Sequence, residues 1–257
     1  MTPDAALPLA GRCVLVTGAS SGIGRAIALA AARHGADVAI TYHANALGAQ
    51  DVLDTIVALE RRAFVFELDL SNEASIHALA PRAREALGRI DAWINNAGAD
   101  ILTGDAAALD TIARLDRLLA VDLRGSIIAS WDAVAVMQQQ PHGGVIINMS
   151  WDHVISGMAG TNPQLFAAVK GGVLAFSKAL ARSVAPNIRV NVIAPGWIET
   201  SFGKGVDAHA HQAVIDATPL KRWGRPEDVA GAAVYLASPA ADFLTGQTIM
   251  VGGGLVM

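Results

Sequence analysis

The sequence predicts an α/β fold in which one doubly wound, seven-stranded parallel sheet carries helices on both faces. Short β-branched or apolar runs alternate with longer alanine-rich segments of helical period, which is the pattern of repeated strand–helix–strand units. Hydrophobic residues make up 53% of the 257 residues and charged residues only 16%, so a large core is available. Because the chain shows no linker, repeat or low-complexity tract, we expect a single domain over residues 1–257.

The strands are expected at seven apolar runs, and the helices lie between them. The predicted strands are Arg12–Thr17, Asp37–Thr41, Ala63–Leu68, Ala92–Asn95, Val145–Met149, Arg189–Ile193 and Thr248–Val251. The predicted helices are Gly22–Arg33, Ala46–Leu59, Glu73–Ala86, Asp110–Met137, Pro163–Val184 and Pro226–Leu236. Since a doubly wound sheet binds its ligand at the carboxyl ends of the strands, the loops that follow the strands are where we expect a site.

Charge and cysteine content exclude several classes of function. The formal net charge is −4 without a long run of like charges, so neither nucleic acid nor a membrane surface is expected as a partner. The single cysteine, Cys13, can form no intramolecular disulfide or cysteine-rich metal site. The chain does not begin with a basic and then apolar leader, and no apolar run reaches about 18 residues. We therefore expect a cytoplasmic protein.

A glycine-rich turn joins the first predicted strand to the first predicted helix. It reads Thr17-Gly18-Ala19-Ser20-Ser21-Gly22-Ile23-Gly24 and is followed by Arg25. Glycine permits positive φ and a close approach of the backbone to a ligand, and free N–H groups at a helix start attract an anion. The arrangement favours a pyrophosphate ligand, and an ordinary tight turn is the alternative.

The spacing of these glycines and several later motifs resemble those of short-chain dehydrogenases and reductases. The later motifs, in order, are Asp69, Asn95-Asn96-Ala97-Gly98, Ile146-Ile147-Asn148-Met149-Ser150, Lys170, Pro195-Gly196-Trp197-Ile198-Glu199-Thr200, the segment 222–230 and Leu244-Thr245-Gly246-Gln247. The resemblance covers nearly the whole chain and is to the 3-oxoacyl-carrier-protein reductase branch in particular. It implies a Rossmann-type sheet, an oxidoreductase activity and a nicotinamide dinucleotide cofactor.

The resemblance also implies which residues bind that cofactor. The glycine turn would hold the pyrophosphate, the residues after the third and fourth strands would flank the adenosine, and the segment after the sixth strand would hold the nicotinamide. The residues implied are Gly18, Ser20, Ser21, Gly22, Ile23, Gly24, Arg25, His43, Asp69, Leu70, Asn96, Ala97, Gly98, Lys170, Pro195, Gly196, Ile198 and Thr200.

The end of the second strand bears on the choice between NAD and NADP. NAD-binding folds usually place a carboxylate there, which accepts a hydrogen bond from the ribose 2′-hydroxyl. The run Thr41-Tyr42-His43-Ala44-Asn45 contains no carboxylate. We therefore expect NADP, with NAD as the alternative, and Arg25 and His43 are the candidates to contact the 2′-phosphate. The alternative for Arg25 is a solvated charge on the helix surface.

The sequence departs from the family at its chemical centre. Most members carry a tyrosine four residues before the lysine, where it exchanges the substrate proton, and this chain has Phe166 before Lys170. Loss of a general acid or base commonly costs about 10²–10⁴ in rate. In the family the lysine also hydrogen-bonds the nicotinamide ribose, a role that Lys170 retains. Cofactor binding and proton transfer are therefore separate questions for this chain.

Several polar residues are candidates for the missing proton chemistry. The family's usual serine pair is Ser150 and Trp151 here, whereas counting back from Phe166 by the family's usual spacing reaches His153. Imidazole and carboxyl groups both carry protons, so His153, Asp152 or an ordered water becomes the substitute acid. The alternative is that Asp152 and His153 are polar residues of a mobile loop.

A carboxylate replaces the family's helix asparagine at Asp122. Asp122 would pair with Lys170 if the two side chains approach each other, and a bond to the backbone is the alternative.

The segment 197–223 is where relatives carry a substrate lid. It contains His209 and His211, which at this spacing point to different helix faces, so no metal site is expected. Trp151, Met158 and Trp197 are candidates to line an apolar substrate pocket, with ordinary core packing as the alternative. We expect the short glycine-rich tail 252–257 to pack against a neighbouring subunit.

These observations predict an NADP-dependent reductase of a small-molecule carbonyl or acyl thioester, with an atypical active site. The alternative is a catalytically inactive dinucleotide-binding protein with a sensing or assembly role. Relatives associate through their long helices and last strand, which implies a homotetramer or homodimer. The apolar face of the helix Pro163–Val184 suits either the sheet or such a partner helix.

Overall fold

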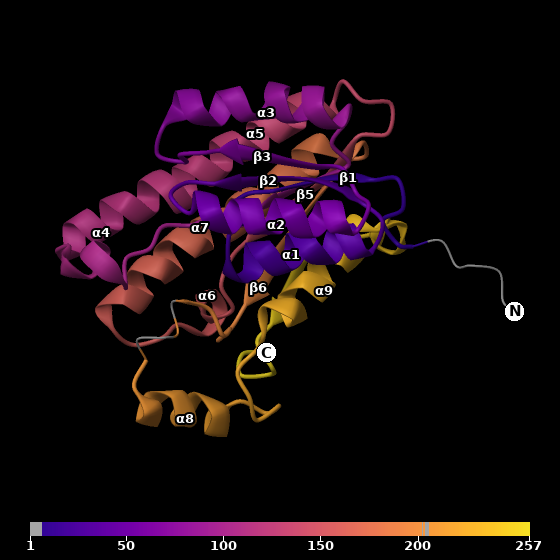
Figure 1. Cartoon of the computed structure of the whole chain (residues 1–257). Helices are drawn as coiled ribbons and strands as arrows, with labels where there is room; N and C mark the ends of the chain where they lie inside the picture. Colours follow the sequence, from indigo (N-terminus) through magenta and orange to yellow (C-terminus); the bar gives the residue numbers. More distant parts are fainter. Residues whose placement is uncertain (1–6, 202, 204–205) are drawn as a thin grey trace, which may run out of the picture.

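The computed structural model describes residues 7–201, 203 and 206–257 of the chain. It shows a parallel sheet between two layers of helices, in the strand order β3-β2-β1-β4-β5-β6-β7 (Figure 1). The strands are β1 (Cys13–Val16), β2 (Asp37–Tyr42), β3 (Ala63–Glu67), β4 (Ala92–Asn95), β5 (Gly144–Met149), β6 (Ile188–Pro195) and β7 (Thr248–Val251). The strand order reverses between β1 and β4, so a crevice is expected at their carboxyl ends.

Nine α-helices occur in the described part of the chain. They are α1 (Gly22–Arg33), α2 (Ala46–Ala58), α3 (Glu73–Leu87), α4 (Thr111–Leu118), α5 (Ser126–Met137), α6 (His153–Ser156), α7 (Thr161–Val184), α8 (Ala208–Ala217) and α9 (Pro226–Ala237). A π-helical segment, η2 (Leu119–Gly125), joins α4 to α5, and η1 (Gly104–Ala108) and η4 (Pro239–Ala241) are short 3₁₀-helices. Helix α8 lies apart from the two layers, below the sheet in Figure 1.

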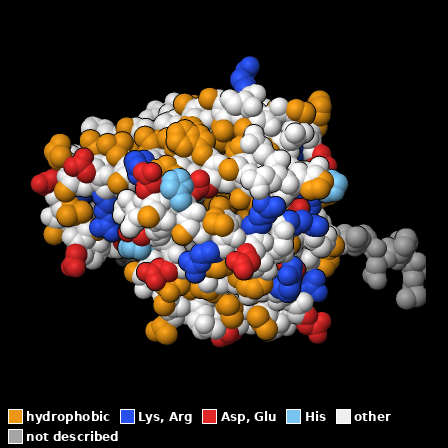
Figure 2. Space-filling model, turned by 90° about the horizontal axis from the view of Figure 1, so that it is seen from above, with side chains coloured by type: hydrophobic (Ala, Val, Ile, Leu, Met, Phe, Trp, Pro, Cys, Tyr) orange, Lys and Arg blue, Asp and Glu red, His pale blue; other side chains and the backbone are white. Residues whose placement is uncertain are grey.

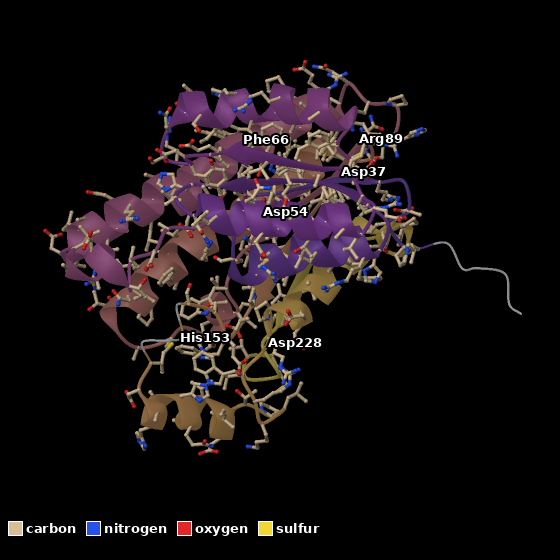
Figure 3. All side chains as sticks on the ribbon, in the orientation of Figure 1. Asp37, Asp54, Phe66, Arg89, His153 and Asp228 are labelled. Carbon is tan, nitrogen blue, oxygen red and sulfur yellow. The ribbon has the colours of Figure 1, made fainter. Side chains whose placement is uncertain are left out.

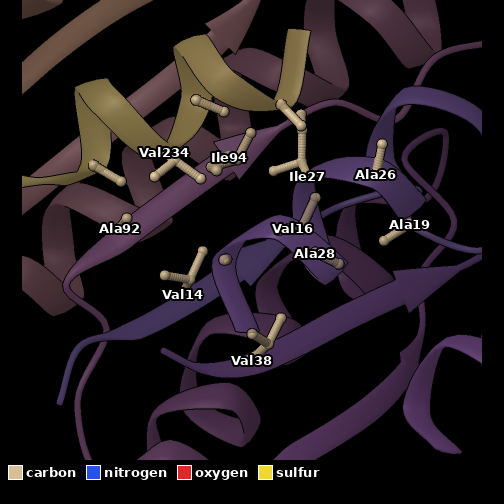
Figure 4. Close-up of a cluster of buried hydrophobic side chains, with 14 of the residues drawn as sticks. Val14, Val16, Ala19, Ala26, Ile27, Ala28, Val38, Ala92, Ile94 and Val234 are labelled. Atoms are coloured by element: carbon tan, nitrogen blue, oxygen red, sulfur yellow. The ribbon is translucent and has the colours of Figure 1, made fainter. Parts of the chain in front are cut away.

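The two faces of the sheet bury separate hydrophobic clusters because successive strand side chains point to opposite faces. Val14 and Val16 of β1 pack with α1, α2 and α9, whereas Cys13 and Leu15 of the same strand pack with α3, α5 and α7. Figure 4 shows the first cluster, where Val234 of α9 lies beside Ala92 and Ile94 of β4. Burial on both faces explains why the strands are continuous apolar runs rather than alternating ones.

The predicted fold class is confirmed. All seven predicted strands and six predicted helices are present, with ends that differ by no more than two residues. The predicted helix Asp110–Met137 is more complex than expected, because it contains the π-helical segment η2. The one-turn helix α6 was not predicted, since four residues are too few for a helical period to show. The glycine-rich tail packs within its own chain, where Gly253 and Gly254 lie against Thr218 and Pro219.

No helix in the described part of the chain is long and apolar enough to cross a membrane. On the face seen in Figure 2, acidic and basic side chains are interspersed with apolar ones.

Candidate functional site

The glycine turn between β1 and α1 is held by Asn96. The Asn96 side-chain amide donates to the carbonyl oxygens of Thr17 at 3.0 Å and of Gly18 at 3.1 Å. The Thr17 hydroxyl accepts in turn from the backbone N–H groups of Asn96 and Ala97, each at 3.0 Å. The side-chain donors of Asn96 are thus used inside the protein, and its role is to shape the turn.

Two of the glycines in the turn are required by geometry. Gly18 has a φ of +64°, and a Cβ there would lie 2.7 Å from the Cα of Ala97. A Cβ on Gly24 would collide with the carbonyl oxygen of Gly18. Among the described residues no side chain caps the start of α1, where Ser21 is the N-cap. The first N–H groups of α1 therefore keep the capacity to bind an anion, and the turn leaves room for one.

A cleft of about 580 Å³ lies against the start of α1. Ser21, Gly22 and Arg25 line one side, and Thr200 and His211 belong to the opposite side. The structure thus brings the glycine turn and the segment after β6 together, as predicted from sequence. This volume is in the range of small-molecule sites in proteins.

The loop after β2 lies beside the glycine turn. Asn45 donates from its side-chain amide to the carbonyl of Ser20 at 3.4 Å, and His43 is exposed. Arg25 forms an ion pair of 2.9 Å with Asp51 of α2, and both side chains are well exposed. Arg25 thus belongs to an exposed ion pair between α1 and α2, in which Asp51 compensates part of its charge.

Asp69 and Leu70 follow β3 at the same edge of the sheet. The Asp69 carboxylate accepts from the Ser71 hydroxyl at 2.6 Å and from the Ser71 N–H at 2.8 Å. The bond from the Ser71 hydroxyl, more than any other contact, holds the pKa of Asp69 below its usual range, and the nearby His43 acts in the same direction. Leu70 is buried, and its side chain lies close to Gly125 of η2.

Asp122 pairs with Lys170 and is also bonded to the backbone, so both of the predicted alternatives occur. The Lys170 Nζ lies 2.8 Å from the Asp122 Oδ2, and the two side chains are 13% and 3% exposed. The other carboxylate oxygen of Asp122 accepts from the Ala99 N–H at 2.7 Å. Asp122 is in the π-helical segment, a distortion that is often found at functional sites. The pair lies directly against Gly98, whose Cβ, if present, would be 2.8 Å from Asp122 Oδ2.

Ser150 connects β5 to α7. Its hydroxyl donates to the carbonyl oxygen of Lys170 at 2.9 Å, and its backbone N–H donates to the carbonyl of Ile193 at 2.8 Å. The hydroxyl proton is therefore already in use, and only the lone pairs of Ser150 remain for a ligand.

Asp152 and His153 form a buried hydrogen-bonded dyad. The His153 Nδ1 lies 2.6 Å from the Asp152 Oδ1, and the residues are 8% and 0% exposed respectively. Both groups are buried, and His153 begins the one-turn helix α6, so neither is an exposed loop residue. Burial raises the pKa of the Asp152 carboxyl, and its hydrogen bond with His153 acts in the opposite direction. Figure 3 shows His153 below the sheet, on the side where α8 lies.

Aromatic rings connect the dyad to α7. The ring of Trp151 stacks on that of His153, with centroids 4.9 Å apart, and meets Phe166 edge-on at 6.3 Å. Phe166 and Lys170 are one helical turn apart, so they share a face of α7. The structure therefore groups His153, Trp151, Phe166 and Lys170 at one end of the sheet.

The predicted lid is built around Trp223. The ring centroids of Trp197 and Trp223 are 5.1 Å apart. His211 of α8 stacks on Trp223, with ring centroids 4.6 Å apart. Trp197 thus belongs to the anchor of the lid, whereas His209 is exposed and Phe202 lies outside the described residues.

Gly252 was not predicted as a site residue, although it contacts Asp152. The run of three glycines near the chain end was the only signal that could have indicated it.

The sheet, its switch point and the glycine turn define the class of doubly wound α/β proteins that bind ligands beside the first strand. Residues 18–256 match the family described as enoyl-(acyl carrier protein) reductase. The chain belongs to the short-chain dehydrogenase/reductase family.

Similar proteins in this family include L-rhamnose 1-dehydrogenase (NAD(P)(+)) of Sphingomonas sp. (strain SKA58), which is 36% identical over 96% of this chain and 97% of its own. The 3-oxoacyl-[acyl-carrier-protein] reductase of Synechocystis sp. (strain PCC 6803) is 34% identical over 97% of this chain and 98% of its own. A solved structure of 7α-hydroxysteroid dehydrogenase with NADH and 7-oxo glycochenodeoxycholic acid is 32% identical, with a TM-score of 0.89 over 100% of this chain and 98% of that one.

Proposed function

We propose that this protein is a nicotinamide-dinucleotide-dependent reductase of small-molecule carbonyl compounds, in which His153 provides the proton that a tyrosine provides in most of the family. The observation that carries this proposal is the buried Asp152–His153 dyad, which packs through Trp151 against Phe166. Family membership supports the oxidoreductase class. The domain spans residues 1–257, with a lid at 197–223.

The residues present fit a dinucleotide cofactor. The uncapped start of α1 leaves backbone N–H donors for a pyrophosphate. Thr200 lies next to Gly22 across the cleft, and Lys170 is held at the end of β5, where its Nζ also donates to the carbonyl of Met149 at 3.4 Å. When bound, the cofactor supplies the hydride. The chain would provide binding, orientation and the proton.

NADP is the proposed cofactor rather than NAD. The loop 42–45 offers no carboxylate to a ribose 2′-hydroxyl, and His43 is exposed beside it. Arg25 is close to the same edge of the glycine turn, although Asp51 compensates part of its charge. The relatives leave this choice open, because the rhamnose dehydrogenase is named for both cofactors.

His153 is the group best suited to transfer a proton. Phe166 has no titratable hydrogen, and the Ser150 hydroxyl already donates to the backbone carbonyl of Lys170. The side chain of Lys170 is itself paired with Asp122. Imidazole changes charge near neutral pH, so it can give a proton to a developing alkoxide and recover it from solvent. We propose that Asp122 and Lys170 serve cofactor binding, while the dyad serves proton transfer.

The substrate is proposed to carry an apolar body next to its carbonyl group. Trp151 and Phe166 place two aromatic rings near the dyad. Apolar side chains are also exposed at Ile155 of α6 and at Met158 in the loop after it. Such a surface favours a hydrophobic ketone or acyl thioester over a strongly polar one.

Turnover on a panel of carbonyl compounds tests this function. The purified protein with NADPH would be mixed with an acetoacetyl thioester, diketones and quinones, and loss of absorbance of the reduced nicotinamide would be followed. We expect oxidation with at least one of these substrates. NADPH binding without oxidation by any of them would contradict the reductase and support the second function below.

A dinucleotide-binding protein without turnover is the second candidate function. It is favoured by Phe166, which lacks the hydroxyl that serves proton transfer in most relatives, while Lys170 is paired with Asp122 and the glycine turn remains complete. Such a protein would sense or assemble in response to NADPH.

We also propose assembly into a homotetramer or homodimer through α5 and α7. Trp131 of α5 is 56% exposed and meets Phe176 of α7 edge-on at 6.1 Å. An exposed tryptophan that packs on a partly buried phenylalanine of the neighbouring helix suits a helix-to-helix interface, where aromatic residues are enriched.

A further inference from the structure

Only one of the two carboxylate oxygens of Asp152 has a hydrogen-bond partner in the described part of the chain. Its Oδ1 is bonded to the imidazole of His153, but its Oδ2 is buried without a hydrogen-bond partner among the residues that the structure describes. Asp152 itself is 0% exposed, and its backbone N–H donates to the carbonyl of Pro195 at 3.2 Å. A buried carboxylate with a free oxygen is costly, so its retention calls for a physical explanation.

Two glycines make the space that this oxygen occupies. A Cβ on Gly196 would lie 2.5 Å from Asp152 Oδ2, and a Cβ on Gly252 would collide with the same oxygen. The two glycines follow neighbouring strands β6 and β7, and the Gly196 N–H donates to the carbonyl of Val251 at 3.0 Å. Any larger residue at either position would push the Asp152 carboxylate away.

The backbone does not require glycine at these two places. Gly253 and Gly254 adopt positive φ values, of +64° and +86°, whereas Gly196 and Gly252 are not among the residues with positive φ. The close approach to Asp152 is therefore the reason that we find for glycine at 252, and at 196 it adds to a second close contact, because a Cβ there would also lie 2.8 Å from the Cα of Gly252. We define these two residues as the glycine pocket.

The position of the carboxylate determines which nitrogen of His153 carries the hydrogen. A carboxylate can only accept, so the Nδ1 that faces it must donate, and the neutral ring then has a free lone pair at Nε2. Trp151 restrains the ring plane by stacking at an interplanar angle of 22°. In the described part of the chain, Nε2 has no hydrogen-bond partner, so it is the atom left for a ligand.

We propose that Asp152 is a positioning residue, which the glycine pocket of Gly196 and Gly252 holds in place and which fixes His153 with hydrogen on Nδ1 and with Nε2 as the proton-transfer atom. This proposal rests on the proposed reductase function, which it deepens. In the reduction, the carbonyl carbon accepts a hydride from the reduced nicotinamide. The carbonyl oxygen takes the proton from Nε2 of the imidazolium, and the ring is left neutral with its remaining hydrogen on Nδ1. Solvent then returns a proton to Nε2.

The tautomer of His153 can be read directly from ¹⁵N chemical shifts of the full-length protein, without any turnover. Wild type is expected to carry hydrogen on Nδ1 when the ring is neutral. Asp152→Asn keeps the shape of the side chain but can donate to Nδ1, so we expect hydrogen to move to Nε2. Gly252→Ala alters neither member of the dyad, and we expect it to give a mixture of tautomers because the carboxylate is displaced.

Gly231→Ala is the matched control for Gly252→Ala. Among the described residues nothing lies within 4 Å of a Cβ at position 231, so this change on α9 should leave the His153 spectrum as in wild type. With an active substrate, Asp152→Asn and Gly252→Ala should each lower the single-turnover rate by about 10²- to 10⁴-fold, and Gly231→Ala should not.

Two results would overturn the positioning role. One is hydrogen on Nε2 in the wild-type ring, which would mean that Asp152 keeps its own proton and donates to Nδ1. The other is an unchanged His153 spectrum in both Asp152→Asn and Gly252→Ala. If Gly252→Ala does not fold, Asp152→Asn decides alone. A third result separates the two proposals. If the wild-type spectrum is as expected and changes in the variants, but none of the carbonyl compounds leads to oxidation of NADPH, the reductase is refuted and the positioning of His153 stands.

Discussion

Asp122 bonds Lys170 with one carboxylate oxygen, at 2.8 Å, and the backbone N–H of Ala99 with the other, at 2.7 Å. A residue of the π-helical segment η2 thereby connects α7 to the loop after β4, with very little exposure to solvent. If one partner of such a pair is removed, the other is left as an uncompensated buried charge.

Asp122→Ala is therefore expected to lower the free energy of unfolding by about 3–5 kcal/mol, because Lys170 and the Ala99 N–H both lose their partner. Denaturant unfolding at neutral pH measures this change. Asp116→Ala, an exposed position on α4, is the control and should remain within about 0.5 kcal/mol of wild type. A similar small effect for both variants would show that Lys170 does not depend on the pair.

Asp228 should contribute stability that depends on pH. Its carboxylate accepts from Arg222 at 2.6 and 2.9 Å and from the Arg225 N–H at the start of α9, and the bond from Arg222 is the main reason that the pKa of Asp228 lies below its usual value. A lowered pKa means that the contribution is complete above the usual aspartate range and is lost as pH falls through the lowered value. Asp228→Asn should thus destabilise by about 1 kcal/mol at pH 7, and the difference should shrink as pH falls below the usual aspartate range. Thermal or urea unfolding of both proteins from pH 7 down to pH 3 tests the sign, and a difference that grows in acid would contradict it.

Asp51 should tune the choice of cofactor. Replacing it by Asn releases Arg25 from its 2.9 Å ion pair, which leaves more positive charge for a 2′-phosphate. Exposed pairs are worth a few tenths to about 1 kcal/mol, so the preference for NADPH over NADH should rise about two- to five-fold. Dissociation constants for both cofactors give the ratio, and Asp54→Asn on the same helix is the control. An unchanged ratio in both variants would mean that Arg25 does not face the 2′-phosphate.

Trp131 should lie in the contact between subunits. Trp131→Ser is expected to shift the protein to a smaller species, because large aromatic residues contribute most to interface affinity. Light scattering after size-exclusion chromatography reports the mass. Leu47→Ser is the control, since Leu47 is 87% exposed on α2, which packs on the opposite face of the sheet from α5 and α7. Equal masses for wild type and Trp131→Ser would place the interface elsewhere.

Local sequence was sufficient for the sheet and the glycine turn. Strands such as β4 are short apolar runs between polar breaks, and the glycine turn follows the first of these runs directly, although the contacts that require Gly18 come from Ala97 after β4. The sequence alone did not decide whether Lys170 and Asp122 form a pair, because they lie in α7 and η2 and meet only if these two helical segments pack together. The burial of Asp152 could not be predicted, since it depends on Gly196 and Gly252, which are distant in the sequence and come together only when β6 and β7 pair.

The proton-donor role of His153 is the central claim, and single-turnover oxidation of NADPH by a reactive carbonyl tests it most directly. His153→Ala should slow that oxidation by about 10²- to 10⁴-fold while the dissociation constant for NADPH stays unchanged. His209→Ala, which removes an exposed histidine of α8, should oxidise NADPH at the wild-type rate. A wild-type rate in His153→Ala would contradict the claim and assign the proton to another group.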